Sequence, residues 1–190
     1  DELLLYGIKN FFITTNYLSG QIDNHFEAKT SPGISYQCIK EDKPLGTIGA
    51  VTLIDNFMYE DVLIMNSDLF TNIDFEDFYK TFKDEGADMA VAAIPYNINI
   101  PYAILDCQVD QIKSFQEKPS HTYYANAGIY LIKKELIDMI PVDTFFNTTD
   151  LLEVLLAKNK KVVKFPIIGY WVDIGKREDF VKTFVECEIG

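Results

Sequence analysis

Asp68 is the acidic residue whose position in the sequence most clearly suggests chemistry. It ends the stretch Val62–Asp68, in which four apolar residues run directly into Asn66 and Ser67. Such a run is typical of a parallel strand buried on both faces, and open α/β sheets bind ligands at the carboxyl ends of their strands. A carboxylate there can hold a divalent metal against a phosphate, since hard cations prefer oxygen ligands. Asp also favours turns and helix caps, so a structural role stays open.

A second stretch that could form part of a binding site is the glycine-bearing segment KPLGTIGAV at residues 43–51. Gly46 and Gly49 allow the backbone to approach another group closely just before a helix begins. An ordinary glycine-containing loop is the alternative, and the segment taken alone favours that interpretation.

The elements that must position these residues follow from the hydrophobic pattern. Apolar runs predict strands at 11–15, 34–39, 62–65, 89–94, 127–132 and 162–168. Apolar residues three and four apart predict helices over 17–26, with Ser19 as its cap, from Phe75 through Phe82, from 148–150 onward, and over 177–186. The early alternation of strands and helices is typical of a sheet with a parallel core.

The later half of the chain has a different pattern. Residues 102–107 and 112–115 read as paired antiparallel strands, and PYNINIP at 95–101 reads as a turn that projects a loop over the sheet edge. The whole pattern predicts an α/β fold with a mixed, mainly parallel sheet flanked by helices. No long linker interrupts it, so residues 1–190 are expected to form a single domain.

Composition and charge exclude several classes of protein. The 190 residues carry 29 acidic and 17 basic side chains, a net charge of -12, which would repel nucleic acid. No apolar run approaches the roughly 20 residues that span a bilayer, and no signal pattern begins the chain, so we expect a cytoplasmic protein without a membrane partner. The three cysteines lack CxxC spacing and are expected to be buried thiols rather than a disulfide framework or zinc site.

Six motifs, in order, carry a resemblance to a known family. They are PLGTIGA at 44–50, NSD at 66–68, PYA at 101–103, FQEKP at 115–119, NAGIY at 126–130 and YWVDIG at 170–175. Together they resemble the sugar-1-phosphate nucleotidyltransferases, or nucleotide-sugar pyrophosphorylases, most closely the bacterial guanylyltransferase-type branch. The resemblance implies a Rossmann-like, GT-A type fold. It also implies transfer of a nucleotidyl group from an NTP, with GTP favoured, to a sugar-1-phosphate, with release of pyrophosphate.

The resemblance also implies roles for individual residues. Asp68 and Asp173 correspond to the ligands of a catalytic Mg2+, and Lys118 to a catalytic cation. The nucleotide-binding positions correspond to Pro44, Leu45, Gly46, Thr47 and Ser67, and the sugar-binding positions to Tyr102, Ala103, Glu117, Asn126 and Gly128. A cap before the last helix is the alternative for Asp173, and a surface ion pair is the alternative for Glu117 and Lys118.

The sequence departs from the family in three places. Members begin with a strand and a Gly-rich, arginine-containing phosphate loop, and nothing here corresponds to them. We therefore expect a truncated, impaired chain or a fragment of a longer enzyme, with unpaired strand edges that favour association with another copy. Ser67 and Ala103 stand where the family commonly has glycine, and the added Cβ at Ala103 is expected to alter sugar choice.

Two other functions compete with nucleotidyl transfer. The first is an inactive nucleotide-sugar-binding or interaction module that keeps the sugar pocket without the phosphate loop. The second is a metal-dependent glycosyltransferase of related fold. A glycosyltransferase of that kind would require a second acidic residue two positions before Asp68, where this chain has Asn66. This function therefore ranks last.

Overall fold

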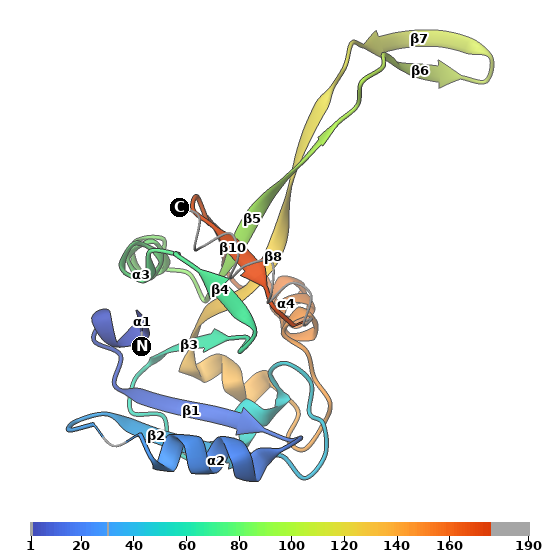
Figure 1. The fold of residues 1–190 in the computed structure, drawn as a ribbon. Helices are drawn as coiled ribbons and strands as arrows, with labels where there is room; N and C mark the ends of the chain where they lie inside the picture. The colour runs from blue at the N-terminus through green and yellow to red at the C-terminus, as the bar shows by residue number, and fades with distance from the viewer. Residues whose placement is uncertain (1, 30, 176–190) are drawn as a thin grey trace, which may run out of the picture. The chain divides into compact units, whose positions relative to one another are not determined.

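The computed structural model describes residues 2–29 and 31–175, and Figure 1 shows the arrangement of their helices and strands. The elements along the chain are α1 (Glu2–Leu5), β1 (Asn10–Thr15), α2 (Ser19–Glu27), β2 (Ser35–Lys40), the 3-10 helix η1 (Gly49–Leu53), β3 (Asp61–Met65), β4 (Leu69–Thr71), α3 (Phe75–Asp84), β5 (Met89–Asn99), β6 (Ile104–Gln108), β7 (Gln111–Gln116), β8 (Ser120–Lys133), the 3-10 helix η2 (Lys134–Met139), α4 (Thr148–Ala157), β9 (Val162–Pro166) and β10 (Trp171–Asp173). The predicted α/β class is confirmed. None of the described helices is both long enough and apolar enough to cross a bilayer.

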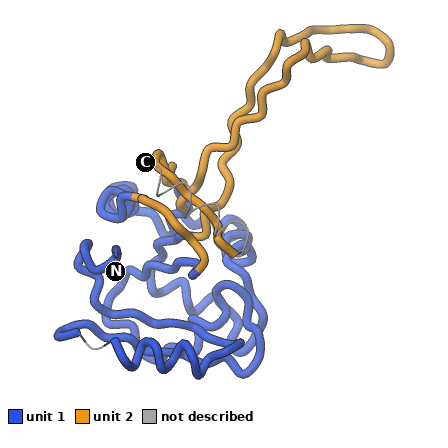
Figure 2. Tube along the Cα trace, in the orientation of Figure 1, with its two compact units in different colours: residues 1–67, 74–91, 129–163 blue, residues 68–73, 92–128, 164–190 orange. Residues whose placement is uncertain are grey.

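The chain forms two compact units, coloured separately in Figure 2. Unit 1 comprises residues 1–67, 74–91 and 129–163, and unit 2 comprises residues 68–73, 92–128 and 164–190. The prediction of one domain over residues 1–190 stays a prediction.

Unit 1 contains the parallel pair β1–β2 and the antiparallel pairing of β3 with β8. β3 is the edge strand of a four-stranded sheet in the order β3-β8-β5-β9. All five residues of β3 are only half-buried, although its sequence is that of a strand covered on both faces. Within the described part of the chain, β1 pairs only with β2 and β3 only with β8, so each strand has one edge without a ladder partner.

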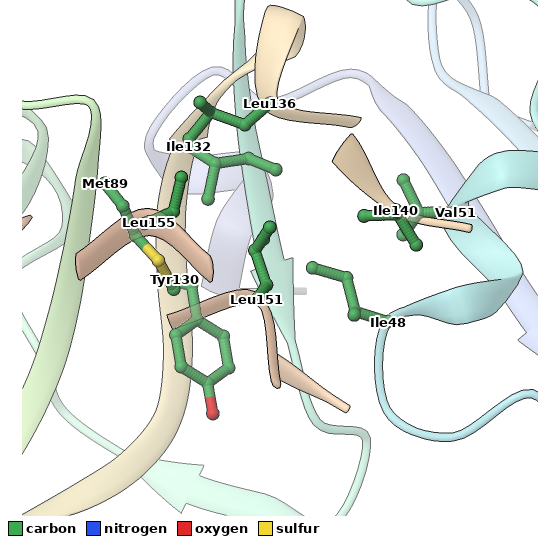
Figure 3. Packing of buried hydrophobic residues seen from close by; sticks show 9 residues of the cluster. All are labelled: Ile48, Val51, Met89, Tyr130, Ile132, Leu136, Ile140, Leu151 and Leu155. Carbon is green, nitrogen blue, oxygen red and sulfur yellow. The ribbon is translucent and has the colours of Figure 1, made fainter. Parts of the chain in front are cut away.

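The hydrophobic core of unit 1 gathers residues from η1, β5, β8, η2 and α4 or their flanks, and Figure 3 shows how they pack. Its members are Ile48, Val51, Met89, Tyr130, Ile132, Leu136, Ile140, Leu151 and Leu155. The α3 helix buries Phe75, Phe78 and Phe82 as its spacing predicted, and the Asp74 carboxylate caps it by accepting hydrogen bonds from the first-turn N–H groups. Asp88, just before β5, connects the start of that strand to the end of β8. Its carboxylate accepts a hydrogen bond from Nζ of Lys133, the last residue of β8, at 2.8 Å.

Unit 2 contains two antiparallel pairs, β4 with β10 and β6 with β7. β5 continues through Pro95 to Asn99, so the turn predicted over residues 95–101 is wrong for most of its length. Residues 95–99 are exposed, and an exposed strand tolerates proline because solvent can satisfy the groups that a ladder would otherwise bond. β8 likewise begins at Ser120, well before the strand predicted at 127–132.

Three smaller predictions need correction or fall outside the described residues. Ser19 is not a cap, because the α2 N-cap is Leu18 in a left-handed conformation without a side-chain hydrogen bond. Cys107 is exposed on β6 and Cys38 is half-buried, so neither is the buried thiol expected. Cys187 and the helix predicted over 177–186 lie outside the described residues.

Candidate active site

Asp68 and Asp173 come together in unit 2, although 105 positions separate them in the sequence. Strand β10 pairs antiparallel with β4, in a register that places Asp173 opposite Leu69. The Ile174 N–H then donates to the Asp68 carbonyl at 2.8 Å, which holds the two backbones together at the carboxylates. Asp68 is half-buried and Asp173 is exposed, so both can reach a ligand from solvent.

Gly175 leaves room between the two carboxylates. A Cβ at this position would lie 2.9 Å from Asp68 Oδ2 and 3.0 Å from Asp173 Oδ1, so both oxygens surround one small space. The Gly175 N–H also donates to Asp173 Oδ1 at 2.9 Å and orients that side chain. Two carboxylates suit Mg2+, which keeps several waters and is commonly held by one or two carboxylates together with substrate phosphates.

In the part of the chain that the structure describes, no larger metal cluster accompanies this pair. Within residues 2–29 and 31–175, no group of three or more His, Cys, Asp or Glu side chains is placed to hold a metal ion. A donor set of two carboxylates, Asp68 and Asp173, fits a hard ion that shares its coordination with water and a phosphate.

The turn at residues 44–50 lies in unit 1 and is held from two sides. On one side, the buried carboxylate of Glu41 accepts a hydrogen bond from the Leu45 N–H at 2.9 Å. On the other side, the Phe146 carbonyl accepts from the N–H groups of Ile48 and Gly49 at 3.2 and 3.1 Å. Leu45 is buried and Thr47 is exposed, so the turn presents Thr47 to solvent from a fixed backbone.

The two glycines of this turn are required by the packing of the protein itself. A Cβ on Gly46, where φ is +77°, would lie 2.6 Å from the Phe146 carbonyl oxygen. A Cβ on Gly49 would lie 2.7 Å from the Thr144 carbonyl oxygen. The group that the glycines approach is therefore the segment 144–147, a partner that the local sequence could not identify.

A cavity of about 1430 Å3 in unit 1 includes two of the predicted nucleotide-binding residues in its wall. Thr47 and Ser67 both line it, together with residues of β1 and every residue of β3. Pro44, Leu45 and Gly46 are not part of this lining. The cavity is larger than the roughly 300–1,000 Å3 of common small-molecule sites, so a nucleotide would not fill it.

The predicted sugar-binding residues and Lys118 belong to unit 2. Figure 1 shows β6 and β7 at the far end of the ribbon that continues β5 and β8, away from β4 and β10. Tyr102 and Ala103 precede β6, and Glu117 and Lys118 follow β7; all four are exposed. The structure therefore does not bring these residues to the carboxylate pair. Lys118 has a left-handed φ of 44°, an unusual conformation for a residue with a side chain.

Asn126 and Gly128 form a local contact at the base of the ribbon. The Asn126 side-chain oxygen accepts from the Gly128 N–H at 3.0 Å, and Gly128 is buried with a φ of +73°. Next to them, the Trp171 ring nitrogen donates to the Ala127 carbonyl at 2.8 Å, which ties β10 to β8 within unit 2.

Sequence reasoning missed the residues that hold the 44–50 turn. Asn147 and Thr148 contact Thr47 across a separation of about 100 residues, and Glu41 reaches the turn with its buried carboxylate. The only local signal was the predicted start of a helix near Thr148, which marks a cap but not its distant partner.

The fold and the carboxylate pair define an α/β protein with an acidic site at the meeting point of two strands. The chain belongs to the nucleotidyl transferase family, whose model matches residues 1–188. It is 26% identical to a mannose-1-phosphate guanyltransferase of Debaryomyces hansenii over 97% of this chain and 53% of that protein. It is 23% identical to mannose-1-phosphate guanyltransferase beta-B of Xenopus laevis over 95% of this chain and 52% of that protein.

The chain thus spans about half the length of these curated relatives. Among solved structures, HddC from Yersinia pseudotuberculosis superposes with a TM-score of 0.71 at 23% identity, covering 97% of this chain and 81% of that one. A second crystal structure of HddC, complexed with GMP-PN, gives a TM-score of 0.68 at 22% identity over the same shares of the two chains. These structures support the Rossmann-like α/β fold.

Proposed function

We propose that this chain transfers a nucleotidyl group from an NTP to a sugar-1-phosphate, forming a nucleotide-sugar and releasing pyrophosphate. The observation that carries the proposal is the meeting of Asp68 and Asp173 around one small space left by Gly175. Membership of the nucleotidyl transferase family supports the class of reaction.

The carboxylate pair has a defined task in this reaction. Asp68 and Asp173 hold Mg2+, which offsets the negative charge of the phosphates when it is bound. The Gly175 N–H keeps Asp173 Oδ1 turned toward the shared space, so the pair is oriented before the ligand arrives. An oxygen of the sugar-1-phosphate attacks the α-phosphorus of the NTP in line, the bond to the β-phosphate oxygen breaks, and pyrophosphate leaves.

The other predicted residues take the binding roles. Thr47 and Ser67 contact the nucleotide, with Pro44, Leu45 and Gly46 forming the turn behind Thr47. The ribbon residues contact the sugar, with Lys118 supplying a compact positive charge to its phosphate. The sugar-binding set is Tyr102, Ala103, Glu117, Asn126 and Gly128.

The names of the relatives support GTP and mannose-1-phosphate as the substrates of the proposed reaction. Both curated relatives are named mannose-1-phosphate guanyltransferases, and HddC crystallised with GMP-PN. The guanine preference and the sugar are therefore part of the proposal, to be tested against other pairs.

The experiment measures pyrophosphate release with Mg2+ and a matrix of five NTPs and several sugar-1-phosphates. Two proteins are compared: residues 1–190 alone, and an extended protein in which the Gly-rich amino-terminal segment of a relative precedes them. We expect turnover by the extended protein, most with GTP, and little by residues 1–190. Asp68→Asn should lower this turnover about 100-fold, while Asp110→Asn, at an exposed turn between β6 and β7, should leave it unchanged.

No turnover with any pair would contradict the proposal. Saturable binding of a nucleotide-sugar without turnover in either protein would instead support the inactive binding module.

A further inference from the structure

The segment before α4 contacts the 44–50 turn through backbone and side chains, all within unit 1. The Phe146 N–H donates to the Leu45 carbonyl at 2.9 Å, and the Phe146 carbonyl accepts two N–H groups of the turn. Two backbone stretches about 100 residues apart are therefore paired in both directions, which fixes the path of the turn.

Asn147 and Thr148 extend this contact to Thr47. The Thr47 N–H donates to Asn147 Oδ1 at 3.3 Å, and the Thr148 N–H donates to Thr47 Oγ1 at 2.9 Å. The two threonine hydroxyls also lie 3.1 Å apart and share a hydrogen bond. Both polar groups that Thr47 adds to the turn are therefore oriented by the first residues of α4.

The contact serves the helix as well as the turn. The N–H groups of the first helical turn have no intrahelical partner, and Thr47 supplies one for Thr148. Asp150 supplies another contact at this end by accepting from the Asn147 N–H at 2.7 Å. Asn147 is also the N-cap of α4 and forms a capping box with Asp150. Asp150 does not take part in the hydrogen bonds with Thr47, so its substitution weakens the cap while leaving those bonds in place.

Exposure distinguishes the residue that can reach a ligand from the residues behind it. Thr47 is exposed and lines the unit 1 cavity, whereas Thr148 is 2% exposed and Asn147 is half-buried. Neither Asn147 nor Thr148 is among the cavity-lining residues. They therefore act on a ligand in this cavity through Thr47.

We propose that Asn147 and Thr148 are positioning residues that preorganise Thr47 and the 44–50 turn for the nucleotide. This inference rests on the proposed function, because it assigns the turn to NTP binding. Holding the turn in its bound conformation removes the cost of ordering it when the ligand arrives, so the contact raises nucleotide affinity without touching the nucleotide.

The test is made on residues 1–190. Binding of magnesium GTP is measured by NMR titration, which detects weak binding, and the ordering of the turn is measured by amide hydrogen exchange. Asn147→Ala should speed exchange of the Thr47 amide about fivefold and weaken GTP binding by a similar factor, the effect of one hydrogen bond. Asn147→Asp keeps the side-chain acceptor and should restore both. Thr148→Val should weaken GTP binding to a similar extent, and Thr148→Ser should restore it.

Asp150→Ala is the matched control, because it removes a contact at the same helix end while leaving Asn147 and Thr47 paired. It should lower the stability of α4 without changing GTP affinity by more than twofold. Equal weakening of GTP binding by Asp150→Ala and Asn147→Ala would reduce the role to helix capping and overturn the proposal.

The outcomes also separate this inference from the function on which it rests. Unchanged GTP affinity in Asn147→Ala, with faster exchange at Thr47, overturns the positioning role alone. No GTP binding by the unmodified chain overturns nucleotide binding by this turn, whatever the exchange rates show.

Discussion

The 44–50 turn of unit 1 and the β6–β7 ribbon of unit 2 carry or adjoin most of the proposed nucleotide-binding and sugar-binding residues, and the protein holds the two regions very differently. The turn has a buried carboxylate on one side and paired backbone on the other, and Leu45, Ile48 and Ala50 are buried. On the ribbon, every residue of β6 and β7 is exposed. A held turn binds without an ordering cost, whereas exposed side chains must be ordered by the ligand.

The ribbon nevertheless has a defined backbone. β6 and β7 pair antiparallel from Ile104 opposite Gln116 to Gln108 opposite Gln111, with a bulge after Asp106. Leu105 lies opposite Phe115 and both are exposed, so this apolar pair is not covered within the described residues. The difference is that the proposed nucleotide-binding turn is held by tertiary contacts, whereas the proposed sugar-binding ribbon is ordered only along its own two strands.

The largest expected effect on stability tests how firmly the turn is held. Gly46→Ala should lower the free energy of unfolding by about 2–3 kcal/mol, because a Cβ at φ +77° is strained and also meets the Phe146 carbonyl at 2.6 Å. Gly33→Ala is the control, since its φ is +78° with nothing within 4 Å. It should lose only about 1 kcal/mol in urea unfolding. Equal losses would mean that the segment at Phe146 does not confine the turn.

Lowering the pH should reveal how much the ion pair between Asp88 and Lys133 contributes to the stability of unit 1. A hydrogen bond from Lys133, backed by the Lys161 N–H, holds the pKa of Asp88 below its usual 3.8. A lowered pKa stabilises the folded state fully above about pH 3.8, and this contribution is lost as the pH falls through the folded-state pKa. Asp88→Asn should therefore lower the free energy of unfolding by about 1 kcal/mol at pH 7, a loss kept small because solvent screens the half-exposed Lys133. At the acid end of the range the same substitution should change it little.

Urea unfolding between pH 7 and pH 2.5 measures this difference. Asp138→Asn, at an exposed position on η2, should leave stability unchanged throughout. A loss in Asp88→Asn that is independent of pH would show that the ion pair does not contribute as described.

Gly175→Ala should separate the carboxylate pair from the stability of unit 2. The Cβ would meet two carboxylate ends, which can rotate away, so the thermal midpoint should change by about 1 °C or less. The rotated carboxylates would no longer share one space, and we expect about tenfold more Mg2+ to be needed for half-maximal turnover by the extended protein. An unchanged requirement would separate Gly175 from the metal site.

The smallest effect is expected on the ribbon. Ala103→Gly in the extended protein should shift the preference among sugar-1-phosphates by about two- to fivefold, because it removes a Cβ from an exposed position. The measurement is kcat/KM for each sugar with GTP held constant. If no sugar preference changed, Ala103 would have no part in sugar binding.

Local sequence signals predicted much of this fold. The apolar run before Asp68 predicted a strand where β3 lies, and the spacing of Phe75, Phe78 and Phe82 predicted α3, because both patterns lie within a few residues. The parallel pairing expected of that run was wrong, since β3 pairs antiparallel with β8. The family resemblance predicted that Asp173 and Asp68 belong to one site, and the structure places them together through the β4–β10 pairing. Those strands have three residues each, too few to give a periodic signal.

Distant contacts and solvent exposure account for what the sequence did not reveal. The partner of the glycines in the 44–50 turn is a backbone about 100 residues away, and no local pattern encodes it. Pro95 indicated a turn because proline interrupts a paired strand, but the strand at this point is exposed and tolerates it. The half-burial of β3 likewise depends on which strands flank it, which its own residues do not specify.

The most direct test of the proposed chemistry is a double-mutant cycle on Asp68 and Asp173 in the extended protein, read as magnesium-dependent pyrophosphate release. If one ion is held by both carboxylates, each Asp→Asn change should lower turnover about 100-fold, the equivalent of about 3 kcal/mol of transition-state stabilisation. The double variant should be little worse than either single one, because the ion is already lost. Turnover close to that of the unmodified protein in either single variant, or losses that multiply in the double variant, would contradict a shared metal site.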